Sequence, residues 1–286
     1  MRWNPGRRRL RVPSVPGMTS DSRTSETGPF DAWLAHFRAN PTRQRAIEAE
    51  VDWSQPCTLD AATRAAFVHS FQRFELGEDG DGARLLAKAE HAGDMVYLAA
   101  LRLLVAEEQR HSALFRRGLE HLGGDRLPAH WSDGAFTLLR RSLGLRTEIA
   151  LFLVAEVVAM RYFVALEQHA PDPVLRGIGR RIATDERDHL RFQVDRLRVG
   201  FRDAPAPVRA VVGAAWTVVA AGATAVLVTD HRAALRACGV RPAAYAVTAL
   251  RDAAAAAREV LGPRRREVLG PLGGRAPTPA PGRASA

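Results

Sequence analysis

The sequence predicts an all-α protein in which an antiparallel four-helix bundle is followed by additional helices and flanked by disordered tails. Three observations predict this class. Long segments place apolar residues three and four positions apart, the spacing that gives a helix one apolar face. Strand signals are missing, because the sequence has no alternating apolar segment and no Asn-Gly hairpin turn. A Glu-x-x-His motif occurs twice, each time with a lone glutamate upstream at the same distance.

The first helices contain two interruptions. Residues 30–50 predict a short lead-in helix or two, interrupted at Pro41, because proline lacks the N–H that a helix interior needs. The first bundle helix should begin after Asp60, whose carboxylate suits an N-cap. The glycine-rich segment 77–82 leaves two alternatives, since the helix either breaks there or continues with a loosened backbone. The predicted core-facing row is Phe67, Phe71, Phe74, Glu78, Leu85 and Ala89.

The other three bundle helices have recognisable ends. The second should cover residues 94–121, with the Gly123-Gly124 pair as a stop. The third runs roughly over residues 133–169. The fourth covers residues 173–199, after Asp172 as N-cap and with a proline at its first position.

A fifth helix opens near residue 203, and residues 210–228 within it carry no charge. Such a run is long enough to span a membrane. It consists mostly of Ala, Val and Gly, however, and is poor in Leu, Ile and Phe. This composition favours a fully buried bundle helix, and a helix inserted in or lying on a membrane is the alternative. A shorter helix should follow over residues 242–261.

The repeated motif predicts a metal site. Residues 106–111 and 184–189 each contain Glu-x-x-His, and residues three apart in a helix lie on one face. A lone glutamate lies 30 residues upstream of the glutamate in each motif. The turns between the helices fall midway, so each lone glutamate should lie level with its motif. Helix bundles hold two metal ions with such a set. The predicted ligands are Glu78, Glu108, His111, Glu156, Glu186 and His189.

Two nearby residues leave alternatives open. Glu75 is a rival to Glu78 as the first ligand, but Glu78 lies on the apolar row and keeps the 30-residue step. A buried carboxylate without a partner costs several kcal/mol, so a glutamate in that row needs a partner or a metal. Tyr162, six residues after Glu156, is either a packing residue or a radical or hydrogen-bonding partner of the site.

Four carboxylates and two imidazoles suit iron or manganese better than copper or a thiolate-preferring metal. We therefore expect two iron ions as the cofactor, with a mixed Mn/Fe pair as the alternative. Reduced iron with open coordination positions binds O2 or peroxide. The electrons should come from an external donor, because the chain has no rubredoxin-type cysteines and no flavin motif.

Residues 61–200 resemble the ferritin-like superfamily of carboxylate-bridged di-iron proteins. The local likeness is to acyl-carrier desaturases, whose Glu-Glu-x-Arg-His and Asp-Glu-x-x-His segments are similar to residues 107–111 and 185–189. The resemblance implies that Asp185 accepts a hydrogen bond from the free ring nitrogen of a ligating histidine. It also implies that Glu108 and Glu186 are bridging carboxylates and that Glu78 and Glu156 are terminal ligands.

These features indicate three functions. The first is an oxidoreductase, an oxidase or oxygenase, that activates O2 to oxidise a small or apolar substrate. The second is a rubrerythrin-like peroxide reductase or an iron-oxidising protein. The third is a metal-poor helical module that associates with a membrane or a partner. The extra helices and the tails fit poorly with a compact ferritin cage, which favours the first function.

The net charge and the cysteine content limit which partners and which cellular compartment are expected. The formal net charge is +10, but residues 1–17 contribute +5 and residues 263–286 contribute +4, so the rest is nearly neutral. A nucleic-acid partner is therefore not expected. Only Cys57 and Cys238 occur, which suits a reducing cytoplasm and disfavours a disulfide framework. A homodimer and membrane association through residues 210–228 stay open.

The chain is expected to divide into four regions. Residues 1–28 form a basic disordered tail, and Met18 is an alternative start. Residues 29–202 form the di-metal bundle, and residues 203–261 form helices that pack on it. Residues 262–286 form a second disordered tail, rich in Pro, Arg and Ala.

Overall fold

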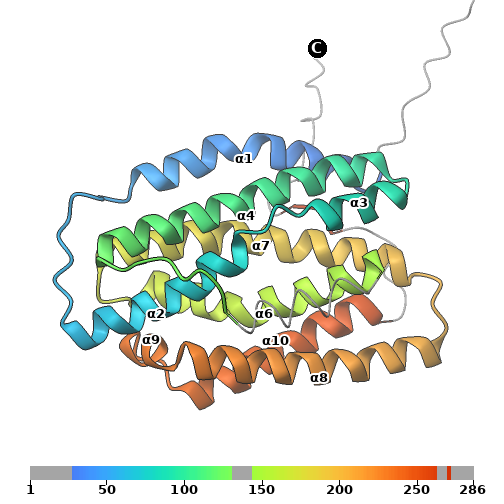
Figure 1. The fold of residues 1–286 in the computed structure, drawn as a ribbon. Coiled ribbons are helices and arrows are strands. Elements are labelled where there is room, and N and C mark those ends of the chain that lie inside the picture. The colour runs from blue at the N-terminus through green and yellow to red at the C-terminus, as the bar shows by residue number, and fades with distance from the viewer. Residues whose placement is uncertain (1–27, 131–143, 263–268, 272–286) are drawn as a thin grey trace, which may run out of the picture.

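The computed structural model describes residues 28–130, 144–262 and 269–271 (Figure 1). Within these ranges the regular elements are α-helices and no strand occurs, so the all-α prediction is confirmed. The helices are α1 (Asp31–Ala49), α2 (Ala61–Glu78), α3 (Ala83–His91), α4 (Met95–Leu122), α6 (Leu145–His169), α7 (Pro173–Phe201), α8 (Ala206–Asp230), α9 (Arg232–Ala237) and α10 (Pro242–Leu261).

The helices form layers. Helix α2 packs on α4, α6 packs on α7, and α4 packs on α7 (Figure 1). Helix α1 covers α4 and α7 from one side, and α8 and α10 cover α6 from the other. The α2–α4 pair is antiparallel, since Val68 lies beside Gly124 while Glu75 lies beside Ser112. The α6–α7 pair is also antiparallel, because residues 170–172 form the whole connection between them.

Three aspartates start the central helices, as predicted. Asp60 accepts hydrogen bonds from the backbone N–H groups of residues 62 and 63 at the start of α2. Asp94 accepts from the N–H of residue 97, and Asp172 accepts from that of residue 175. Each carboxylate satisfies backbone donors that the first turn of a helix leaves unpaired. Gly123 ends α4 in the left-handed conformation, which glycine adopts without steric cost.

The predicted interruption at Pro41 is wrong, because α1 continues through it. Proline removes one backbone hydrogen bond from a helix interior, a cost that packing can offset. The buried residues Phe37, Asn40 and Gln44 flank the proline on the face that α1 turns to α4 and α7.

The glycine-rich segment does break the first bundle helix, which was one of the two alternatives. Helix α2 ends at Glu78 and α3 begins at Ala83. Gly82, before α3, has φ +63°, a conformation that side chains other than glycine rarely adopt. The predicted start of the third bundle helix, near residue 133, lies outside the described residues, and α6 is described from Leu145.

Two apolar clusters form the core, with a polar layer between them. One cluster gathers around Phe71, Phe115 and Phe163, and the other around Tyr97 and Phe192. On α4 and α7, the Glu-x-x-His motifs occupy the turns between the residues that belong to the two clusters. The motifs are therefore held inside the protein by apolar packing on either side.

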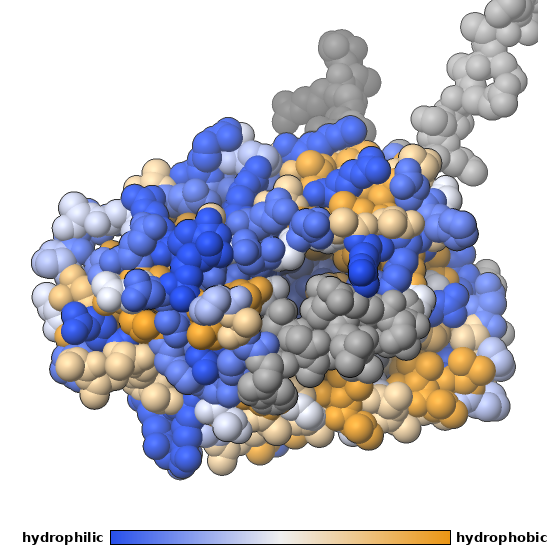
Figure 2. Space-filling view, viewed as in Figure 1, coloured by the Kyte–Doolittle hydropathy of each residue, from blue (hydrophilic) through white to orange (hydrophobic). Residues whose placement is uncertain are grey.

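The prediction that residues 210–228 are fully buried is wrong. Helix α8 buries one face, which consists of Trp216, Ala220, Thr224 and Leu227, and leaves the opposite face exposed. Val211 is 70% exposed and Val218 is 72% exposed. Figure 2 shows apolar residues along the lower edge of the molecule, where α8 lies. Helices α6 and α8 are both long and apolar enough to cross a membrane, which is weak evidence for membrane association.

Part of the predicted C-terminal tail is packed. The backbone N–H groups of Leu269 and Gly270 donate to the buried carboxylate of Asp195 at 2.7 and 3.0 Å. Arg191 on α7 donates to the carbonyl oxygen of Gly270 at 2.9 Å. The prediction of disorder from residue 262 is therefore wrong for residues 269–271. The predicted N-terminal tail lies outside the described residues except for Gly28.

Candidate metal centre

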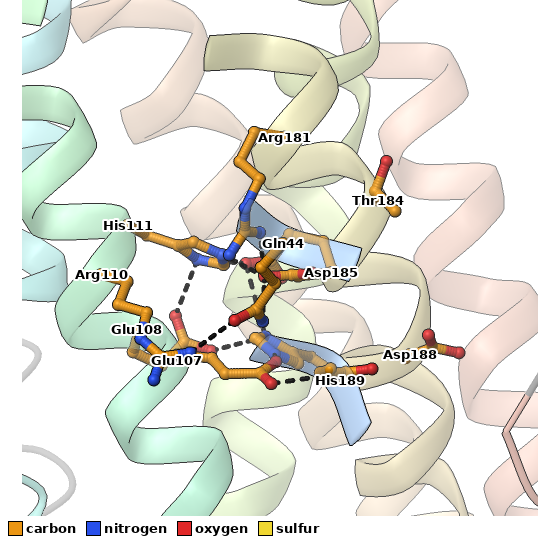
Figure 3. A network of polar contacts seen from close by, with 12 residues as sticks. Gln44, Glu107, Glu108, Arg110, His111, Arg181, Thr184, Asp185, Asp188 and His189 are labelled. Carbon is orange, nitrogen blue, oxygen red and sulfur yellow. Dashed lines mark hydrogen bonds and ion pairs between the residues drawn. The ribbon is translucent and has the colours of Figure 1, made fainter. Parts of the chain in front are cut away.

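Helices α4 and α7 bring the two motifs together (Figure 3). Each of Glu108, His111, Glu186 and His189 offers a ligand atom, and these atoms lie within 4.8 Å of one another. His189 Nδ1 lies 2.7 Å from Glu108 Oε1, and His111 Nδ1 lies 3.3 Å from Glu186 Oε1. Each histidine therefore faces the glutamate of the other helix as well as its own.

The inward-facing atoms are buried and lie close to one another as ion pairs, but none of these contacts is a hydrogen bond. Within the described part of the chain, Nδ1 of His111, Nδ1 of His189, Oε1 of Glu108 and both carboxylate oxygens of Glu186 have no hydrogen-bond partner. Buried polar atoms are normally paired, because leaving one unpaired costs about 1–3 kcal/mol. Nitrogen and oxygen atoms that converge in this way could hold a metal ion.

The two lone glutamates lie at the same place. Glu78, the last residue of α2, and Glu156, in the middle of α6, line one cavity together with Glu108 and Glu186. Burial raises the pKa of both Glu78 and Glu156 well above its usual value, and the charges of Glu108 and Glu186 raise it further. Four carboxylates so close together repel one another unless cations or protons offset their charge.

The histidines partly offset this charge. Burial lowers the pKa of His111, but its hydrogen bond to Asp185 and the neighbouring glutamates raise that pKa well above its usual value. Burial likewise opposes the charged form of His189, but Glu108 and Glu107 raise its pKa. Burial would raise the pKa of Glu108, yet the two imidazoles hold it well below its usual range. The site thus favours positive charge at its centre.

A second pair of carboxylates holds the outer nitrogens of the histidines. His111 Nε2 lies 3.2 Å from Asp185 Oδ2 on α7, and His189 Nε2 lies 2.9 Å from Glu107 Oε2 on α4. Carboxylates in this position orient metal-ligating histidines and fix which ring nitrogen faces the metal. The sequence predicted this contact for Asp185 and missed it for Glu107. The signal was present, because an acidic residue precedes the glutamate in both motifs.

Helix α1 supports both outer carboxylates. Asn40 Nδ2 donates to Glu107 Oε1 at 3.0 Å, and Gln44 Nε2 donates to Asp185 Oδ2 at 3.0 Å. The buried guanidinium of Arg181 also donates to Asp185. Asn40 and Gln44 lie four residues apart, so they occupy one face of α1. The sequence did not predict a role for α1 in the site, because amides at helical spacing carry no specific signal.

Glu75, the rival first ligand, is buried but points elsewhere. Its Oε1 lies 3.1 Å from Nη2 of Arg116 and 2.6 Å from Nη2 of Arg126. It is not among the residues that line the cavity beside Glu78. Two guanidinium groups therefore pair with Oε1 of the rival carboxylate, and the preference of the sequence analysis for Glu78 agrees with the cavity lining.

Comparisons of the chain with family models, with curated proteins and with solved structures found no match. The described geometry defines the class: an all-helical protein with a buried cluster of glutamates and histidines that could hold a metal.

Proposed function

We propose that this chain is a ferritin-like di-iron oxidoreductase that activates O2 to oxidise a small, mainly apolar substrate. The observation that supports the proposal is that four glutamates from four helices line one cavity, and two of them share a buried cluster with His111 and His189. The inward-facing atoms of that cluster make no hydrogen bonds.

The residues divide between two cations. His111 and Glu78 would serve one ion, and His189 and Glu156 would serve the other, because each lone glutamate interacts electrostatically with that histidine. Glu108 and Glu186 would be shared. Mixed oxygen and nitrogen ligands suit iron, with a Mn/Fe pair as the alternative. When bound, reduced iron supplies electrons to O2, and an external donor must restore them.

The chain's own groups would prepare the site for this chemistry. Asp185 and Glu107 hold the histidine rings so that both Nδ1 atoms face inward. The apolar residues of the cavity, such as Leu104 and Phe74, exclude water from the reacting centre. A cavity of about 560 Å3 beside the glutamates favours an organic substrate. A peroxide reductase or an iron-oxidising protein would not need such a space.

Metal content tests the proposal. The purified full chain, loaded with Fe(II) without oxygen and then desalted, should hold about two ions per chain. A Glu108→Ala/His111→Ala variant should hold almost none. A Glu120→Ala/His91→Ala variant is the matched control, because it removes the same residue types from exposed positions. A wild-type chain without iron or manganese would overturn the proposal. Peroxide consumption that needs no organic substrate would favour the rubrerythrin-like alternative.

A second candidate function rests on α8. Its exposed face carries Val211 and Val218 beside small residues, which would suit a module associated with a membrane or a partner. Flotation of the chain with lipid vesicles, compared with a Val211→Ser/Val218→Ser variant, tests this function. If α8 binds membranes, the wild-type chain should float with the vesicles and the variant should not. The function is wrong if both proteins stay in the soluble fraction.

A further inference from the structure

The cavity beside the glutamates has a second polar end. At one end lie the four glutamates and Gln193, whose Nε2 donates to Glu156. Besides these groups and Tyr97, the polar lining residues are Arg73, Asp230 and His231. The rest of the cavity lining consists mainly of apolar side chains of α2, α4, α6 and α8, including Phe74, Ala155 and Leu227. Such a cavity suits an elongated molecule that is apolar along its length and polar at one end.

His231 belongs to a buried chain of hydrogen bonds outside the metal centre. The hydroxyl oxygen of Ser70 on α2 lies 2.6 Å from that of Tyr162 on α6, and 2.7 Å from His231 Nδ1. The three side chains are buried, and the ring of Phe74 packs on both Tyr162 and His231. Because Ser70 occupies Nδ1, Nε2 is the ring nitrogen of His231 that remains for a ligand in the cavity.

The polar end carries no net charge. Burial lowers the pKa of His231 to about 3, so the imidazole is neutral at physiological pH. Arg73 and Asp230 carry opposite charges, and Arg73 Nε lies 3.8 Å from Asp230 Oδ2. A charged ligand group would lose its hydration here without gaining a free opposite charge. An alcohol hydroxyl both donates and accepts hydrogen bonds, so it pairs with a neutral imidazole in either tautomer.

The two ends are separated by a fixed length of helix. Along α2, eight residues separate Ser70 from Glu78, which corresponds to roughly 12 Å. Along α6, six residues separate Tyr162 from Glu156, which corresponds to roughly 9 Å. A molecule whose hydroxyl contacts His231 would therefore present carbon atoms about 9–12 Å away to the metal centre.

We propose that His231, held by Ser70 and Tyr162, is a positioning residue that anchors the hydroxyl end of an aliphatic alcohol whose far end reaches the glutamates. The claim that this alcohol is the substrate rests on the proposed function. The claim that the cavity binds the alcohol is independent of that function, because the hydroxyl contacts His231 and no metal ion.

Binding of matched eight-carbon probes tests the inference. 1-Octanol, octane, octanoate and octylamine share one chain and differ only at the end. Calorimetry on the full-length protein should show 1-octanol binding about 10-fold more tightly than each of the others, the effect of about one net hydrogen bond. The preference should be the same with and without bound iron, so failure of the metal proposal would leave this result intact.

Variants at the polar end test whether His231 causes the preference for 1-octanol. His231→Leu should bind 1-octanol and octane equally, while His231→Gln, which restores a polar group, should recover part of the difference. If His231→Leu does not fold, Ser70→Ala serves instead, because it releases the ring and should lower the preference. His91→Leu, at an exposed position, should leave it unchanged. Equal binding of all four probes, or an unaltered preference in the His231 and Ser70 variants, would overturn the inference.

Discussion

The two halves of the candidate metal centre use the same residues but are supported differently. Helices α2 and α4 supply one half, and α6 and α7 supply the other. Glu78 is the last residue of its helix, whereas Glu156 lies within a continuous helix. Glu107, which holds His189 of the second half, has one neighbour from α1. Asp185, which holds His111 of the first half, is bound by both Gln44 and Arg181. The repeated spacing therefore determines the chemistry, and the surrounding helices determine how rigidly each half is held.

Removing Glu186 should have the largest effect, because it belongs to both halves. Its Oε1 lies 3.3 Å from Nδ1 of His111 and 3.7 Å from Nδ1 of His189. Glu186→Ala should lower metal affinity by more than the ~10–100-fold that residues supporting a metal ligand contribute. Competition with a chelator measures the loss, with Glu120→Ala as the control. If one ion still binds with wild-type affinity, the two halves do not share Glu186.

Substitutions of the outer carboxylates should show which half of the candidate site is supported more firmly. Asp185→Asn should lower metal affinity roughly 10–100-fold, and Glu107→Gln should have a smaller effect of the same kind. Asp185→Asn should also lower the free energy of unfolding by about 2 kcal/mol, because buried Arg181 would then depend on Glu48 alone. Chelator competition and urea unfolding measure both quantities. Equal losses of affinity and stability in the two variants would mean that the halves are equally supported.

The stability of the metal-free protein should depend on pH in a direction that these pKa shifts determine. Folding raises the pKa of His111, His189, Glu78 and Glu156, so these groups hold their protons more tightly in the folded state. The resulting stability is complete below the unfolded values, about 4.3 for Glu and 6.5 for His, and is lost as the pH rises through the folded values.

Two carboxyl groups act in the opposite direction at lower pH. Neighbouring cations hold the pKa of Glu108 and Asp185 below its usual range against the effect of burial, so their contribution is lost only as the pH falls below about 4. The melting temperature of the metal-free protein should therefore decrease from pH 6.5 upward. Metal affinity should increase over the same range, because ligands release protons on binding. A metal-free protein whose stability rises with pH would contradict this account.

The smallest expected effects test the loop beside Glu78. Gly80→Ala should stabilise the protein by about 0.4–1 kcal/mol, because a side chain there meets open space and restricts the unfolded chain. Gly82→Ala should destabilise it by about 1 kcal/mol or more, because φ is +63° and the new Cβ would lie 2.8 Å from Val105. Thermal unfolding of the two variants compares them directly. Similar shifts for both would mean that this backbone is not as restricted as the structure indicates.

Several features follow from local chemistry and could be read from the sequence. The starts at Asp60, Asp94 and Asp172 depend on a side chain that pairs with backbone groups two or three residues away. The Glu-x-x-His spacing puts two ligands on one face of any helix. The equal 30-residue step, with a turn midway, predicted that each lone glutamate would lie level with its motif.

Other features depend on which helices become neighbours, and only the tertiary structure decided them. The sequence favoured Glu78 over Glu75 but gave no partner for Glu75, which the structure pairs with Arg116 and Arg126. Pro41 stays within α1 because α4 and α7 pack against that helix. The uncharged run in α8 is half exposed because only one of its faces meets other helices. Spacing along the chain determined which residues could act together as ligands. Burial and long-range partners decided what each side chain contacts, because they arise only when distant segments pack together.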